Sequence, residues 1–195
     1  MTRAHYVGPW RIDVTVRGGV ARSTSEASLA RTIARAAKAA GAPSPASIGL
    51  ILSDDAELAA LNDAYMAKRG PTDVLSFPLL PPEAYPPHPG RNASSEAIPT
   101  PFALPPGRRP HLGDVVVSVE RAIEQAEAGR GGQTGDLRWS AADELHLLVT
   151  HGALHLCGWD HAEPEEEAAL RALETRLLGE LDAIDVRVHR LRARP

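Results

Sequence analysis

The hydrophobic positions along the chain first indicate four β-strands. Residues 46–53, ASIGLILS, form an apolar run of strand length, whereas residues 10–17 alternate between apolar and polar side chains. Two further stretches are short and rich in valine and leucine. We expect strands at residues 10–17, 46–53, 73–80 and 113–120.

Other segments place apolar residues three or four positions apart, which is typical of amphipathic helices. Ser23 and Glu26 form a capping-box pattern at the start of the first helix, and Gly41 is a typical residue to end it. The strongest pattern begins at Ser140, which is a good N-cap, and stops at Gly158. We expect helices at residues 23–41, 54–66, 121–129, 140–158 and 163–182, followed by a loose basic tail over residues 186–195.

The segment between the last two expected strands differs in composition from the rest of the chain. Residues 81–110 are dense in proline, so they cannot maintain a helix and they donate few backbone hydrogen bonds. We predict an exposed loop inserted into a single domain that spans residues 1–195; the alternative is a docked polyproline segment that binds a partner. The order of elements indicates an α+β fold with one mixed four-stranded sheet and about five helices.

Composition and charge limit the cellular compartments and the binding partners that we expect for this protein. Cys157 is the only cysteine, so no intramolecular disulfide can form, and no apolar run has the length of a signal peptide or a membrane helix. We therefore expect a cytoplasmic protein with no membrane partner. The net charge is −4, yet residues 1–41 hold seven basic and two acidic residues. This excess predicts a local phosphate-binding face, unless the arginines only fill exposed positions.

Three histidines lie close together in the segment HGALHLCGWDH, residues 151–161. His151 and His155 are four residues apart on the helix expected at residues 140–158, so their imidazoles project from one face. Gly158 allows the chain to reverse direction after the helix and to bring His161 towards the same point. A catalytic zinc site typically has three protein ligands, such as three neutral imidazoles, and a fourth position open to water or substrate. The spacing therefore predicts one Zn²⁺ per chain, bound by His151, His155 and His161 at the end of a long helix.

The residues beside these histidines refine the expected chemistry. In zinc proteases with this spacing a glutamate follows the first histidine and deprotonates the metal-bound water, whereas Gly152 stands here. The candidate bases are Asp160 and acidic residues that other parts of the fold bring to the site; Asp160 could instead orient one of the imidazoles. His146 lies off the ligand face and Cys157 points away from it, so we expect both to be structural.

The same segment carries a family resemblance. HGALHLCGWDH resembles the H-G-x-L-H-L-x-G-x-D-H signature of the YbeY family of bacterial endoribonucleases and rRNA maturation factors. Two other segments are similar to motifs of this family and follow in the same order: LNDAYMAKRGPTDVLSFP at residues 61–78 and LGDVVVS at residues 112–118. Together with the helices that contain Glu120 and Glu174, the resemblance covers most of residues 46–180.

The resemblance implies a zincin-like α+β domain that binds one zinc ion and cleaves single-stranded RNA. It also implies a role in 16S rRNA maturation and ribosome quality control, with the ribosomal small subunit, its proteins and the GTPase Era as partners. By the same resemblance, the substrate groove lies between the metal helix and the strand near Thr72, Asp73 and Ser76.

The chain departs from the family pattern at two places. Met66 follows the aromatic residue of the second helix, where the family commonly has an arginine proposed to contact phosphate. Lys68 and Arg69 offer a replacement charge just downstream, although a flexible lysine lacks the planar guanidinium of arginine. The proline-rich stretch at 81–110 is much longer than the usual connection, and its position next to the expected groove would let it cover or extend that groove.

The residues and the resemblance together predict a zinc-dependent, single-strand-specific endoribonuclease. The candidate catalytic residues are His151 and Asp160, and the candidate substrate-binding residues are Lys68, Arg69, Thr72, Asp73 and Ser76. Zinc would polarise the scissile phosphate and activate either water or the 2′-hydroxyl of the RNA. The alternatives are a non-catalytic ribosome-assembly factor in which zinc only fixes the turn at His161, and a metallopeptidase, which Gly152 disfavours.

Overall fold

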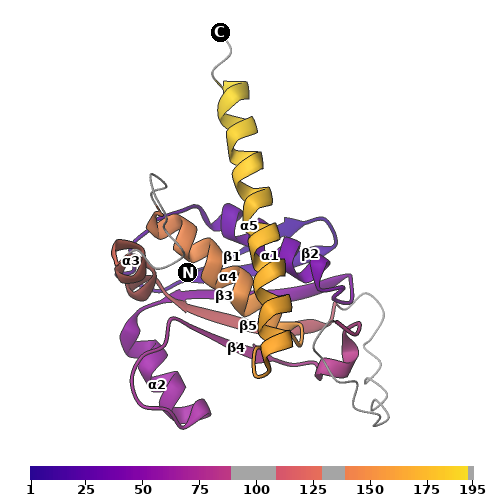
Figure 1. Cartoon of the computed structure of the whole chain (residues 1–195). Coiled ribbons are helices and arrows are strands. Elements are labelled where there is room, and N and C mark those ends of the chain that lie inside the picture. Colours follow the sequence, from indigo (N-terminus) through magenta and orange to yellow (C-terminus); the bar gives the residue numbers. More distant parts are fainter. Residues whose placement is uncertain (89–108, 129–138, 193–195) are drawn as a thin grey trace.

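The computed structural model describes residues 1–88, 109–128 and 139–192, with the backbone alone beyond residue 179. Its elements are arranged as an α+β fold, shown in Figure 1. The strands are β1 (Thr2–Val7), β2 (Trp10–Val16), β3 (Ala46–Ser53), β4 (Val74–Pro78) and β5 (His111–Ser118). The helices are α1 (Glu26–Ala39), α2 (Asp55–Met66), α3 (Val119–Glu127), α4 (Ala141–Leu156) and α5 (Pro164–Arg192), with a 3₁₀ turn, η1, at Pro82–Ala84.

The described strands form one mixed five-stranded sheet in the order β1-β2-β3-β5-β4. β2, β3 and β5 are parallel neighbours, whereas β1 and β4 pair antiparallel at the two edges. The expectation of four strands is therefore wrong by one, because the sequence pattern misses β1. Strand β1, with the sequence TRAHYV, lies at a sheet edge and most of its side chains are exposed. It therefore lacks the apolar pattern that marks the other strands.

Helices cover both faces of this sheet (Figure 1). The hydrophobic cores on the two faces differ in size. α4 lies against β4 and β5 and also contacts α1, α3 and α5. These elements enclose the main core, to which Leu145 and Leu154 of α4 contribute almost fully buried side chains. On the opposite face α2 covers β4 and β5 through a small cluster of Leu58, Leu75 and Val116. Edge strand β4 is therefore held between α2 and α4.

The bounds of two helices differ from those expected. α1 is capped by Ser25, whose hydroxyl accepts a hydrogen bond from the amide of Ser28, so the predicted cap at Ser23 is wrong. α5 continues to Arg192, so residues 186–192, expected to be loose, are helical. That stretch contains neither proline nor glycine to end the helix. Within the described ranges, none of the helices combines the length and the apolar character that a bilayer span requires.

The start of the proline-rich segment packs against the main core. Tyr85, which follows η1, is only 4% exposed. Pro86 lies against Gly41, where an added Cβ would stand 2.7 Å from the proline ring. The expectation of an exposed loop over residues 81–110 therefore does not hold at Tyr85, and residues 89–108 lie outside the described part of the chain.

Replacement of residues 89–108 by a glycine–serine linker should leave the melting temperature nearly unchanged, because surface loop length costs little free energy. Tyr85→Ala in the full chain should lower the free energy of unfolding by about 3–5 kcal/mol, the usual cost of removing a buried aromatic side chain. Thermal unfolding of both variants gives the comparison. A larger loss in the linker variant than in Tyr85→Ala would show that residues 89–108 belong to the core.

Candidate metal centre and its groove

Helix α4 holds the first two histidines of the motif side by side. The helix begins with a capping box in which Ser140 and Asp143 exchange hydrogen bonds, as expected for an N-cap at Ser140. His151 and His155 follow in its C-terminal half, one helical turn apart. Their Nε2 atoms are 3.0 Å apart, so the two imidazoles face a common point.

The third histidine reaches this pair through a tight turn. Gly158 follows α4 with a φ of +82°, a conformation that favours glycine, and the chain reverses there. The ring centroid of His161 lies 5.0 Å from that of His155 and 5.6 Å from that of His151. One ring nitrogen from each histidine lies within 4.8 Å of the other two. The structure thus brings together the three predicted ligands.

A carboxylate from α5 fixes the orientation of His151. Nδ1 of His151 donates a hydrogen bond to Oε1 of Glu174 at 2.7 Å, and Glu174 is only 9% exposed. This bond leaves the lone pair of Nε2 directed at the other histidines. From the sequence, Asp160 is expected to act either as a base or by orienting an imidazole. For His151, the orienting residue is Glu174. One feature of the sequence could have indicated Glu174: it is an acidic residue within the apolar stripe of α5, between Leu170 and Leu177.

Burial keeps the imidazole of His155 neutral. Desolvation, with smaller contributions from His151 and His161, lowers the pKa of His155 to about 4. The carboxylate of Asp160 and a hydrogen bond with the backbone of Trp159 act in the opposite direction. At pH 7 the ring is therefore uncharged, which is the form that coordinates a metal ion.

The three histidines fit a metal ion with an open position. Nitrogens bound to one tetrahedral zinc lie roughly 3.3 Å apart, because zinc–nitrogen bonds are about 2.0–2.1 Å long. The 3.0 Å between the Nε2 atoms of His151 and His155 is close to this value. A carboxylate behind one of the imidazoles, here Glu174, is the usual support of a metal-bound histidine.

Gly152, where zinc proteases carry a glutamate, faces the sheet. A Cβ at this position would lie 2.6 Å from Cγ1 of Val115 and 2.9 Å from Cγ2 of Val74. The hydroxyl of Ser76 donates a hydrogen bond of 2.9 Å to the carbonyl oxygen of Gly152. The glycine therefore allows α4 to approach β4 and β5 closely, and a side chain here would point into the core.

The histidines lie in a groove of about 1190 Å³. Its walls come from β4, from the C-terminal end of α2 and from α4 and α5. Of the predicted substrate-binding residues, Lys68, Thr72, Asp73 and Ser76 line this groove, whereas Arg69 is exposed and lies outside the lining. The structure thus gathers most of the predicted site residues on one surface.

Several of these side chains are engaged with other parts of the protein. Asp73 accepts hydrogen bonds from the hydroxyl of Thr72 at 3.2 Å and from the amide of Gln125 at 3.0 Å. Asp160 lines the groove, and its Oδ1 accepts a hydrogen bond from the backbone amide of His161 at 2.8 Å. These bonds shape the groove wall and the turn that carries the third histidine.

Three further groove residues were not predicted from the sequence. Trp139 donates a hydrogen bond of 2.6 Å from its indole Nε1 to Glu144, which is only 1% exposed. Arg171 of α5 also lines the groove and donates two hydrogen bonds to Glu167. Only the packing of α5 beside α4 places Arg171 in the same groove as the histidines, which no local pattern reveals.

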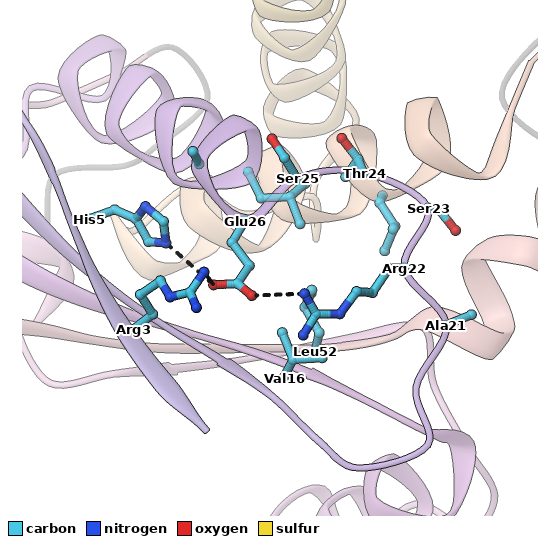
Figure 2. A pocket seen from close by; sticks show the side chains of 13 residues that line it. Arg3, His5, Val16, Ala21, Arg22, Ser23, Thr24, Ser25, Glu26 and Leu52 are labelled. Carbon is cyan, nitrogen blue, oxygen red and sulfur yellow. Dashed lines mark ion pairs between the residues drawn. The ribbon is translucent and has the colours of Figure 1, made fainter.

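The basic N-terminal residues are largely paired with acids. A separate hollow near these residues has a volume of about 230 Å³. In it, Arg3 and Arg22 converge on Glu26 (Figure 2), with ion-pair distances of 3.9 and 3.6 Å. Arg17 forms a two-point ion pair with Glu57 in the same way. For these three arginines, local acidic partners offset the charge that predicted a phosphate-binding face.

His146 and Cys157 have structural positions, as expected. Nδ1 of His146 lies 2.8 Å from the hydroxyl of Thr32 on α1 and therefore joins α4 to α1. Cys157 is fully buried, and burial raises the pKa of its thiol to about 12. The thiol is therefore protonated at neutral pH, and Cys157 is not one of the residues whose ligand atoms converge with those of the three histidines.

The chain is similar to proteins named Endoribonuclease YbeY. The family model with this description matches residues 16–182. The Endoribonuclease YbeY of Salinispora tropica is 46% identical over 68% of this chain and 73% of its own length. That of Thermobifida fusca is 38% identical over 86% of this chain and 91% of its own, and that of Mycolicibacterium gilvum is 36% identical over 92% and 88%. The solution structure of a Thermotoga maritima protein covers 87% of this chain and 92% of its own with a TM-score of 0.47 and 19% identity.

Proposed function

The chain belongs to the YbeY endoribonuclease family, and on this basis we propose that it cleaves single-stranded RNA with a metal ion held by His151, His155 and His161. The observation that carries the proposal is the group of three imidazoles within one large groove. The volume of about 1190 Å³ exceeds the usual range of small-molecule pockets, so a short length of polymer fits it better than a small substrate.

We assign the metal as one zinc ion per chain. Three imidazoles without a thiolate suit zinc, and the low pKa of His155 keeps that ligand ready to bind. Two of the ligands stand one turn apart on α4, with the third just beyond its end. This arrangement supports the description of residues 1–195 as one zincin-like domain with an insertion between β4 and β5.

The protein's own groups orient the reaction. When bound, the metal polarises a phosphate oxygen and lowers the pKa of a bound water molecule. Glu174 holds the ring of His151, and Asp160 holds the backbone of His161. Asp160 also lines the groove, so we assign to it the acceptance of the proton from the attacking group.

The attacking group is either water or the 2′-hydroxyl of the RNA, and the products distinguish the two. Attack by the 2′-hydroxyl expels the 5′-oxygen and leaves a 2′,3′-cyclic phosphate. Attack by water leaves a linear phosphate. A substrate with one 2′-deoxynucleotide at the cleaved position therefore resists the first reaction and permits the second.

Two cations line the groove and are candidates for phosphate contacts, and one of them, Arg171, also pairs with Glu167. Lys68 follows α2 beside Met66, which stands where the family commonly has an arginine, and Arg171 lies on α5. Lys68→Ala and Arg171→Ala should each weaken binding of single-stranded RNA and reduce the slope of log K against log salt by roughly 0.7, the value for one phosphate contact. Fluorescence anisotropy over a salt series gives both quantities.

Matched variants test whether this effect belongs to the groove. Lys38, an exposed lysine of α1, lies outside the groove lining, and Lys38→Ala should change neither the affinity nor the slope. Arg69→Ala tests whether the exposed neighbour of Lys68 contacts RNA from outside the groove. Equal losses in Lys38→Ala and Lys68→Ala would mean that binding follows total charge instead of the groove.

We further propose that the substrate is small-subunit rRNA. In this role the protein acts in the cytoplasm in 16S rRNA maturation and ribosome quality control, with the ribosomal small subunit and the GTPase Era among its partners. Family membership supports the proposal. Cells without the protein should accumulate 16S rRNA precursors, and the His151→Ala variant should not restore processing.

One assay separates the proposal from its two alternatives. Single-stranded RNA, a duplex of the same sequence and a peptide substrate are incubated with the metal-loaded protein and with the metal-free protein. The proposal predicts metal-dependent cleavage of the single strand alone. A metallopeptidase would cleave the peptide, although position 152 of this chain faces the sheet. A non-catalytic assembly factor would bind RNA and leave it intact.

A further inference from the structure

We infer that residues 81–88, the first part of the proline-rich insertion, position the metal centre, and that His88 makes the decisive contacts. The inference rests on the proposed metal function, because it concerns how the third ligand is held. The turn that joins α4 to this ligand, residues 158–161, is called the ligand turn below.

Among the described residues, the ligand turn has few contacts of its own besides the bond from the amide of His161 to Asp160. The amides of Gly158 and Trp159 donate to the carbonyl oxygens of His155 and Leu154, the Schellman pattern that ends α4. Beyond them the chain leaves regular structure, and both Asp160 and His161 are exposed. A ligand at such a position loses conformational freedom when it binds a metal, so support from a neighbouring segment raises metal affinity.

Residues 82 and 88 supply this support. His88 donates a hydrogen bond from Nε2 to the carbonyl oxygen of Gly158 at 3.0 Å. Its ring stacks on the indole of Trp159, with centroids 4.2 Å apart and an angle of 9° between the planes. Pro82 also packs against this turn, where a Cβ on Gly158 would stand 3.2 Å from the Cα of Pro82. Two consecutive residues of the ligand turn are therefore held from outside.

The supported residues are connected to two of the three ligands. The amide of Gly158 donates to the carbonyl oxygen of His155, and His161 follows Trp159 by two residues. The supporting segment is itself anchored, because Tyr85 is buried in the main core and Pro86 packs on Gly41. The core thus fixes the ligand turn through residues 81–88, from a position outside the groove lining.

His88 is consequently a positioning residue, and its removal should weaken zinc binding without loss of the fold. Among the described residues, His88→Ala removes one hydrogen bond and one ring contact, which corresponds to a roughly three- to tenfold weaker zinc affinity. His88→Gln retains an N–H donor and His88→Phe retains the stacked ring, so each should recover part of the loss. His111→Ala is the matched control, because His111 bonds to Ser47 and Asp114 on β3 and β5, outside the groove lining.

The experiment measures two quantities on the full-length variants. Competition with a chromophoric chelator gives the zinc affinity, and hydrogen exchange of the metal-free protein gives the protection of residues 158–161. We expect His88→Ala to lower both, with partial rescue by glutamine and phenylalanine and no effect of His111→Ala. Zinc affinity and exchange equal to wild type in His88→Ala would overturn the inference, even if wild type cleaves RNA. Conversely, a wild-type protein that does not cleave RNA would contradict the proposed function. The hydrogen exchange measured for residues 158–161 would still decide whether His88 positions the ligand turn.

Discussion

His151→Ala is expected to remove the bound zinc and to abolish RNA cleavage at the same time. His151 supplies one of three imidazoles, and its Nδ1–H bond to Glu174 holds the ring in place. Loss of an outer partner of a metal ligand weakens binding by about 10- to 100-fold, so loss of the ligand itself should exceed about 100-fold. Atomic emission after dialysis against a weak chelator measures zinc per chain.

Two other substitutions calibrate this result. His146→Ala, five residues earlier on α4, removes a histidine that bonds to Thr32 and should retain one zinc per chain. Glu174→Gln should give an intermediate loss, because it weakens the bond to His151 without removing a ligand. One zinc per chain in a His151→Ala/His155→Ala double variant would rule out these residues as the metal ligands.

Gly152→Glu is expected to destabilise the fold severely and not to create a peptidase. The added side chain would start 2.6 Å from Val115 and 2.9 Å from Val74, in the tight contact between α4 and the sheet. It would also bring a carboxylate into a buried site. Overpacking alone costs about 1–3 kcal/mol, and an unpaired buried charge adds to it. Urea denaturation gives the free energy of unfolding.

Gly152→Ala separates the two causes, since it adds only the methyl group. We expect it to lower the free energy of unfolding by about 1–3 kcal/mol and to retain zinc, because the nearest neighbours of a methyl group at position 152 would be Val115, Val74 and Ser76 of the sheet and not a histidine. The sequence and the structure therefore lead to different interpretations of Gly152. The sequence indicates the absence of the base found in zinc proteases, whereas the structure shows that Gly152 allows close packing of α4 on the sheet. If Gly152→Glu melts at the wild-type temperature, α4 does not lie as close to β4 and β5 as described.

The sequence predicts the metal ligands because their geometry is local. A spacing of four residues on a helix places His151 and His155 on one face, and a glycine with positive φ returns His161 to them within a few residues. The same holds for the N-cap at Ser140, whose partner Asp143 is three residues away. Wherever sequence neighbours decide the arrangement, the pattern is sufficient.

The sequence does not predict contacts between residues of distant elements. Glu174 reaches His151 only because α5 packs beside α4. His88, in the proline-rich segment, contacts Gly158 just beyond the end of α4. Strand β1 was missed for a related reason, since its pairing with β2 at the sheet edge stabilises it without an apolar pattern. These contacts depend on tertiary packing, which neither periodicity nor capping signals encode.

Cleavage of one single-stranded RNA by the wild-type protein and by His151→Ala tests the central claim most directly. The assay uses wild-type protein with zinc, wild-type protein stripped by a chelator, stripped protein reloaded with zinc, and His151→Ala, each with a parallel measurement of RNA affinity. We predict cleavage by the first and third samples only. His151→Ala should retain much of the affinity, because Lys68 and Arg171 still line the groove. Cleavage by His151→Ala at the wild-type rate would contradict a catalytic metal at this site.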